Sequence, residues 1–191
     1  MDEYKISKYL IDNVTPYDDG SYGKYYRASA YLKDKTYIPC VMFGNPQNMI
    51  NLAVKRFKET EKNDLEYRII VESFVTKHSC IPIWDIRKVE VSPYAWPMEI
   101  LKLIEGETVM GWTAFTVLMK DGKLFSYGTS FNFEFFDLPD GYSYNDISEI
   151  HNGKVVNNNN LELDFSFDVD EEIKYFREKP MFYCYTHCLP E

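Results

Sequence analysis

The chain has 191 residues, of which 45% are hydrophobic and 17% aromatic, and its formal net charge is −9 at pH 7. This length suffices for a hydrophobic core, and the many aromatic rings exclude a disordered chain, because burying them offsets the entropy lost on ordering the backbone. Four cysteines are few for a chain of this length, so disulfides are not needed for the fold. The composition predicts one globular domain that spans residues 1–191.

The acidic residues are concentrated in one part of the sequence. Residues 132–172 contain eleven acids and a single base, Lys154, whereas residues 1–131 contain seventeen of each. A surface of one sign attracts basic proteins and repels the phosphates of nucleic acids. The charge distribution therefore favours a basic protein partner and disfavours direct binding to nucleic acid.

The first residues and the apolar stretches of the sequence indicate the cellular compartment of the protein. Residues 1–5 include acids where a signal peptide has bases, and no later stretch reaches eighteen uninterrupted apolar residues. We therefore expect a cytoplasmic protein without membrane contact, in which the cysteines remain thiols.

Alternating apolar and polar residues predict strands along most of the chain. The runs lie at 23–33, 36–43, 66–75, 83–91, 112–119, 124–136, 161–169 and 181–187. A turn at 33–35 joins the first two runs into an antiparallel pair. Asp121-Gly122 predicts a two-residue hairpin turn, because this dipeptide accepts positive φ angles.

Helical patterns interrupt these strands. The best of them covers about 46–61, where Asn45 is a capping residue, Pro46 suits the first turn, and an apolar stripe follows. Shorter helices are predicted near 98–104, 145–150 and 171–178. Since strands and helices do not alternate regularly, we predict an α+β fold: a mainly antiparallel sheet with one long helix (about 46–61) and two or three short helices packed on it.

The segment 161–170 is the sharpest acidic feature. Its apolar residues alternate with Glu162, Asp164, Ser166, Asp168 and Asp170, which predicts a strand with one buried face and one negative face. Such a face is either a solvated sheet edge that discourages strand addition or a binding surface for a basic partner. An EF-hand calcium loop is excluded, because valine occupies the sharp-turn position and tyrosine the bidentate position, while a weaker oxygen-ligand site for a divalent ion stays open.

Aromatic residues flank the acidic region. Rigid rings beside carboxylates are typical of protein-binding hot spots, and the loop at 137–144 combines both, with Pro139 and Gly141 restricting its shape. The predicted partner-binding residues are Asp137, Asp140, Tyr142, Tyr144, Glu149, Glu162, Asp164, Asp168 and Asp170.

The cysteines and histidines suggest a metal site only weakly. Cys184, His187 and Cys188 form a fragment that His78 and Cys80 could complete as a zinc site. In a strand, however, His187 faces away from both cysteines of the fragment. We therefore predict no metal and no cofactor, while metal binding by this fragment stays open.

These features predict a small acidic cytoplasmic binding protein that inhibits or regulates a basic protein partner without catalysis. The sequence contains no nucleophile elbow, zinc-protease helix, phosphate loop or dinucleotide fingerprint. An alternative is an enzyme or small-ligand protein with an aromatic cleft that uses His151 or His187. A third is a structural or assembly subunit. Neither the partner nor the oligomeric state follows from the sequence.

Overall fold

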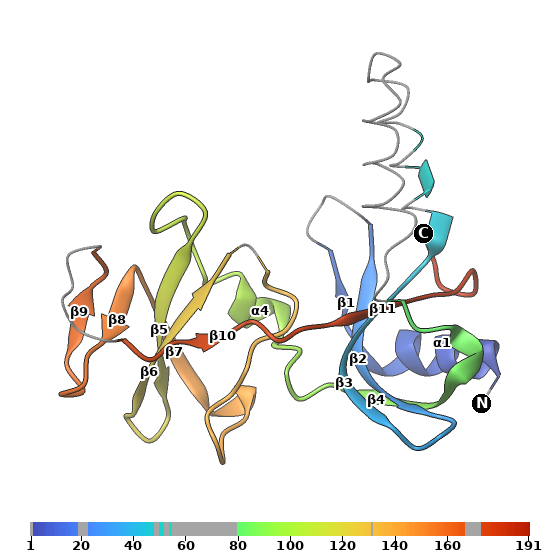
Figure 1. Cartoon of the computed structure of the whole chain (residues 1–191), viewed down its shortest axis with the longest axis horizontal. Coiled ribbons are helices and arrows are strands. Elements are labelled where there is room, and N and C mark those ends of the chain that lie inside the picture. Colours follow the sequence, from blue (N-terminus) through green and yellow to red (C-terminus); the bar gives the residue numbers. More distant parts are fainter. Residues whose placement is uncertain are drawn as a thin grey trace. The chain divides into compact units, whose positions relative to one another are not determined.

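The computed structural model describes residues 2–18, 23–47, 50–51, 54, 80–130, 132–166 and 173–191, and the chain divides into two compact units (Figure 1). The first unit contains Met1–Ser92 and Met181–Glu191, and the second contains Pro93–Pro180. The single domain at 1–191 stays a prediction, because compactness does not decide whether two units fold independently.

The first unit is built on a five-stranded sheet. Strand β2 (Tyr25–Leu32) pairs antiparallel with β1 (Pro16–Tyr17), β3 (Tyr37–Gly44) and β4 (Ile86–Val91), while β11 (Phe182–Tyr185) lies parallel to β3. The predicted turn between the first two runs is present, with Lys35 at a φ of 75°. A short 3-10 helix, η2 (Ile83–Asp85), precedes β4.

Helix α1 (Glu3–Asn13) packs against β2 and β4 (Figure 1). The carboxylate of Asp2 caps it by accepting a hydrogen bond from the backbone N–H of Lys5 at 2.9 Å. Ile6 and Leu10 lie on one side of the helix and are fully buried in the core of this unit. This helix was not expected from the sequence.

The second unit contains a four-stranded sheet in the order β10-β6-β5-β7. Its strands are β5 (Thr113–Met119), β6 (Leu124–Thr129), β7 (Ile147–Asn152) and β10 (Phe176–Arg177). Helix α4 (Met98–Leu101) and the 3-10 helix η3 (Tyr144–Asp146) are short. A separate hairpin of β8 (Lys154–Val156) and β9 (Glu162–Asp164) packs on β5 and β6 through β8. The core consists largely of aromatic rings, with Phe115 stacked on Tyr127 at 5.3 Å between centroids.

The β5–β6 hairpin confirms the strands predicted there, but its turn differs from the prediction. Gly122 has a φ of 87°, whereas Asp121 keeps a negative φ. The backbone N–H of Met119 bonds to the carbonyl of Lys123, so three residues form the loop. A type I turn followed by a left-handed glycine has this geometry, and it needs positive φ at one position only.

The predicted fold class is wrong. Among the elements whose bounds the structure describes, the protein is mainly β, with eleven strands and two α-helices, of 11 and 4 residues. Of the predicted helix at 46–61, residues 46, 47, 50, 51 and 54 are helical, and the others lie outside the described residues, as does the run at 66–75. Segment 145–150 is η3 followed by β7, and segment 171–178 contains β10, because short apolar patterns fit either element and strand pairing decides between them.

In the described part of the chain, no helix combines the length and the apolar character that crossing a membrane requires.

Candidate functional site

Three polar side chains from the second unit meet between β7 and β9. Glu149 and His151 are two residues apart on β7 and therefore share one face of the sheet. His151 Nδ1 lies 2.6 Å from Glu162 Oε1 on β9, and His151 Nε2 lies 3.3 Å from Glu149 Oε2. We call Glu149, His151 and Glu162 the histidine cluster.

The two carboxylates favour the charged form of the ring. The hydrogen bond to Glu162 raises the pKa of His151 most; partial burial opposes this effect, and Glu149 adds to the increase. In the imidazolium form each ring nitrogen donates a proton to one carboxylate, so the ring links β7 to β9. In the neutral form the ring keeps one hydrogen bond to a carboxylate, because only one of its nitrogens then has a proton to donate.

The ring predicted as an anchor, Tyr142, makes contacts within the second unit. Its hydroxyl donates to Asp121 Oδ2 at 2.5 Å, and its ring lies edge-on to Phe125 at 5.4 Å. This hydrogen bond is the main reason why the pKa of Asp121 is lowered. Lys123 lies 5.5 Å from the centre of the same ring. Tyr142 is thus half-buried against the β5–β6 hairpin, and Tyr144 in η3 is also half-buried.

The remaining predicted site residues are dispersed over the second unit. Asp137 accepts a hydrogen bond from Lys179 Nζ at 3.3 Å, and the exposed Asp164 accepts one from Lys154 Nζ at 2.5 Å. Asp140 is exposed in the turn before η3. Asp168 and Asp170 lie outside the described residues.

The predicted alternation holds over residues 163–166, where Leu163 and Phe165 are half-buried and Asp164 and Ser166 are exposed, but it fails at the start of the strand. Leu161, expected on the buried face, is 59% exposed, whereas the side chain of Glu162, expected on the solvent face, is 26% exposed. Strand β9 ends at Asp164, and the fully buried Val155 on β8 provides the apolar contact of this hairpin. Val155 pairs with the half-buried Leu163 of β9, so both strands contribute to this apolar face, and Glu162 contacts His151.

The net charge of the chain belongs to one unit. Residues 93–180 contain sixteen acids and seven bases, which accounts for all nine net negative charges, whereas the first unit contains fourteen of each. The acidic stretch was predictable from the sequence, but the boundary of the neutral unit was not. Glu149 and Glu162 belonged to the predicted binding surface, and His151 belonged to the enzyme alternative. The spacing of Glu149 and His151 on a single strand was the available signal.

The proposed zinc fragment does not come together on the described residues. Cys184 is buried in β11, and burial raises its pKa to about 12, while His187 and Cys188 are exposed beyond the strand. No group of three or more His, Cys, Asp or Glu among the described residues is placed to hold a metal ion. His78 lies outside them.

A shallow pocket of about 270 Å³ lies beside β6 in the second unit. Phe125 and Phe176 form aromatic walls, and Lys174 and Asn157 add polar groups. Its lining includes neither His151 nor a cysteine, so this pocket does not provide the catalytic groups that the enzyme alternative requires.

Comparison with protein-family models, curated proteins and solved structures gave no match.

Proposed function

We propose that this protein is a non-catalytic binding protein that inhibits or regulates a basic protein partner through its second unit. The confinement of the whole net negative charge to Pro93–Pro180 carries this proposal. A unit with such a charge attracts a cationic surface over several ångströms and accelerates association, whereas the neutral first unit contributes no net attraction.

The histidine cluster is the part of this surface that we expect a cationic group to contact. Two carboxylates share one imidazolium there, so the cluster stays negative even when His151 is protonated, and the side chain of Glu149 is 64% exposed. By contrast, Lys120 and Lys123 balance the charges of Asp121 and Asp146 at the β5–β6 turn. An arginine of the partner would pair with Glu149, while Asp140 and Asp164 contribute to long-range attraction.

The two alternatives have less support. The enzyme alternative needs His151 or His187 beside a pocket that holds a substrate, and neither histidine lines either of the two pockets that the structure describes. The assembly reading predicts a large particle at every ionic strength, which size-exclusion chromatography measures directly.

The proposal is tested first with a defined cationic probe. A fluorescein-labelled octa-arginine peptide, with octa-glutamate as the sign control, is titrated with the protein, and binding is followed by fluorescence anisotropy at several salt concentrations. We expect octa-arginine alone to bind and its affinity to fall steeply with salt, because screening weakens attraction between exposed charges. Equal binding of both peptides, or of neither, would contradict the proposal.

Matched variants locate the surface. Asp140→Lys/Glu149→Lys reverses two exposed charges on the second unit, and Asp85→Lys/Glu191→Lys makes the same change in net charge on the first. We expect the first pair to weaken octa-arginine binding about tenfold and the second pair much less, since local charges dominate steering. A similar effect of both pairs would show that net charge, rather than this surface, determines binding.

The biological partner is sought by capture from the source cells at low salt. The captured protein is then assayed with and without added wild-type protein. A basic protein whose activity falls on addition of wild type, but not of Asp140→Lys/Glu149→Lys, supports inhibition. Capture of acidic proteins alone argues against it.

A further inference from the structure

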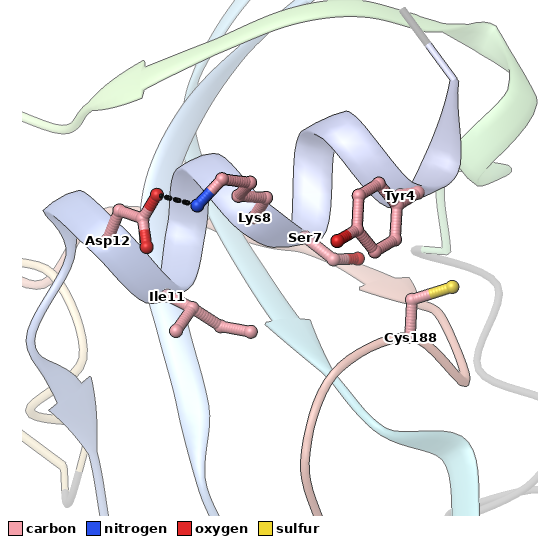
Figure 2. A pocket seen from close by; sticks show the side chains of 6 residues that line it. All are labelled: Tyr4, Ser7, Lys8, Ile11, Asp12 and Cys188. Atoms are coloured by element: carbon pink, nitrogen blue, oxygen red, sulfur yellow. Dashed lines mark hydrogen bonds and ion pairs between the residues drawn. The ribbon is translucent and has the colours of Figure 1, made fainter.

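A second pocket, of about 210 Å³, lies in the first unit between α1 and the residues that follow β11 (Figure 2). Tyr4, Ser7 and Ile11 line it from successive turns of α1, because residues three and four apart share one face of a helix. Cys188 lines it from the other side. The backbone N–H of Cys188 donates to Thr186 Oγ1 at 3.1 Å, which holds the turn in place.

Ser7 is an unusual lining residue. Its side chain is only 2% exposed, and its hydroxyl has no hydrogen-bond partner among the described residues. A serine within a helix ordinarily bonds to a backbone carbonyl of the preceding turn or to water. Figure 2 shows the Ser7 side chain directed to the side of α1 where Tyr4 and Cys188 lie. A buried hydroxyl without a hydrogen-bond partner is available to bond to a polar ligand atom that enters the pocket.

The rim of the pocket contains one positive and one negative side chain. Lys8 Nζ and Asp12 Oδ2 lie 2.7 Å apart on the exposed surface of α1 (Figure 2). Side chains of opposite sign next to each other complement a ligand that carries both a carboxylate and an ammonium group.

Cys188 differs from the other cysteines in its surroundings. Cys40 and Cys184 are buried, and Cys80, although exposed, does not line this pocket. Cys188 is thus an exposed thiol beside a pocket that contains an unpartnered hydroxyl and both signs of charge.

We infer that Cys188 is a thiol-modification site whose pocket accepts a small zwitterionic disulfide, such as the disulfide of an amino-acid thiol. The Cys188 thiol loses its proton to solvent, and the thiolate attacks one sulfur of the ligand disulfide. A new S–S bond forms to Cys188 as the ligand S–S bond breaks, and the released half leaves as a thiolate that takes up a proton. The Cys188 sulfur is oxidised and the departing sulfur is reduced. Lys8 and Asp12 position the carboxylate and ammonium groups of the bound half, and Ser7 bonds to one of its polar atoms.

The experiment uses the reduced full-length protein and two disulfides. Cystine carries both charges, and bis(2-hydroxyethyl) disulfide carries neither. Modification of each cysteine is followed over time by peptide mass spectrometry, with Cys80 as the internal reference. We expect cystine to modify Cys188 about tenfold faster than Cys80, and this preference to fall at least about threefold with the neutral disulfide.

Two variants separate the pocket from simple exposure of the thiol. Lys8→Gln changes an exposed residue, and Ser7→Ala removes only the unpartnered hydroxyl. We expect both to reduce the cystine preference of Cys188 while its labelling rate with iodoacetamide stays at the wild-type value. The inference is overturned if Cys188 reacts no faster than Cys80, or if the preference for cystine persists in both variants. Circular dichroism of each variant verifies the fold.

Discussion

The contact of His151 with two carboxylates predicts that the stability of the second unit depends on pH. The pKa of His151 is raised in the folded protein, so the ring binds its proton more tightly there than in the unfolded chain. Its contribution to stability is fully present below the unfolded pKa of about 6.5 and is lost as the pH rises through the folded pKa. His151→Gln removes this contribution and keeps a polar side chain of similar reach.

The size of the effect follows from the two contacts. The bond to Glu162 is short and the His151 side chain is 29% exposed, so its charged form contributes about 1.5–2 kcal/mol. The bond to Glu149 is longer and more exposed, which limits it to about 0–1 kcal/mol. We therefore expect His151→Gln to lower the free energy of unfolding by about 2 kcal/mol at pH 6 and by about 0.5–1 kcal/mol at pH 9, where a neutral imidazole keeps one hydrogen bond.

Two measurements examine this prediction. Urea denaturation of wild type and His151→Gln at pH 6 and pH 9 gives the difference in stability, with His187→Gln as the control for an exposed histidine outside the cluster. An NMR titration of the His151 ring gives its pKa directly, and the variants assign the signal. The predicted role of the two carboxylates is refuted if His151→Gln lowers the free energy of unfolding equally at both pH values, or if Glu162→Gln leaves the pKa of His151 unchanged.

The other predictions concern packing and turns. A Cβ at Gly128 would lie 2.2 Å from Cζ2 of Trp112. Gly128→Ala should therefore lower the free energy of unfolding in urea by about 1–3 kcal/mol, and by far less when Trp112 is replaced by leucine. An equal decrease in both backgrounds would contradict the clash. Lys35 has a positive φ, so Lys35→Gly should raise the unfolding free energy by about 0.5–1 kcal/mol, and a loss of stability would argue against strain there. Tyr142→Phe removes the hydroxyl bonded to Asp121, so carboxyl NMR should show the pKa of Asp121 closer to its ordinary value, and no change would mean that this bond is absent in solution.

Hairpins were the most predictable part of the fold. The strands on either side of Asp121-Gly122 were located from local patterning because β-branched and aromatic residues flank a strong turn signal there. The pair β2–β3 was found for the same reason. Both depend on neighbours in sequence, so tertiary contacts were needed only to determine the exact turn type.

Long-range pairing was not predictable. Strand β11 joins a sheet whose other strands come from the first 91 residues, and β10 pairs with β6 across some fifty intervening residues. Nothing local distinguishes residues 176–177 from the end of a helix. Their place in the sheet depends on the edge that β6 offers, and this edge exists only after the chain has folded.

The candidate site, like the fold, was predictable from the sequence only in part. The amino-acid sequence alone established that the chain is acidic, that its acids cluster after residue 131 and that its rings are numerous, because composition and order along the chain require no coordinates. Only the tertiary structure brought Glu162 to His151, paired Asp164 with Lys154 and left Ser7 unpartnered beside Cys188. Electrostatic and hydrogen-bond energies fall off within a few ångströms, so they depend on distances between residues that the order of the chain does not specify.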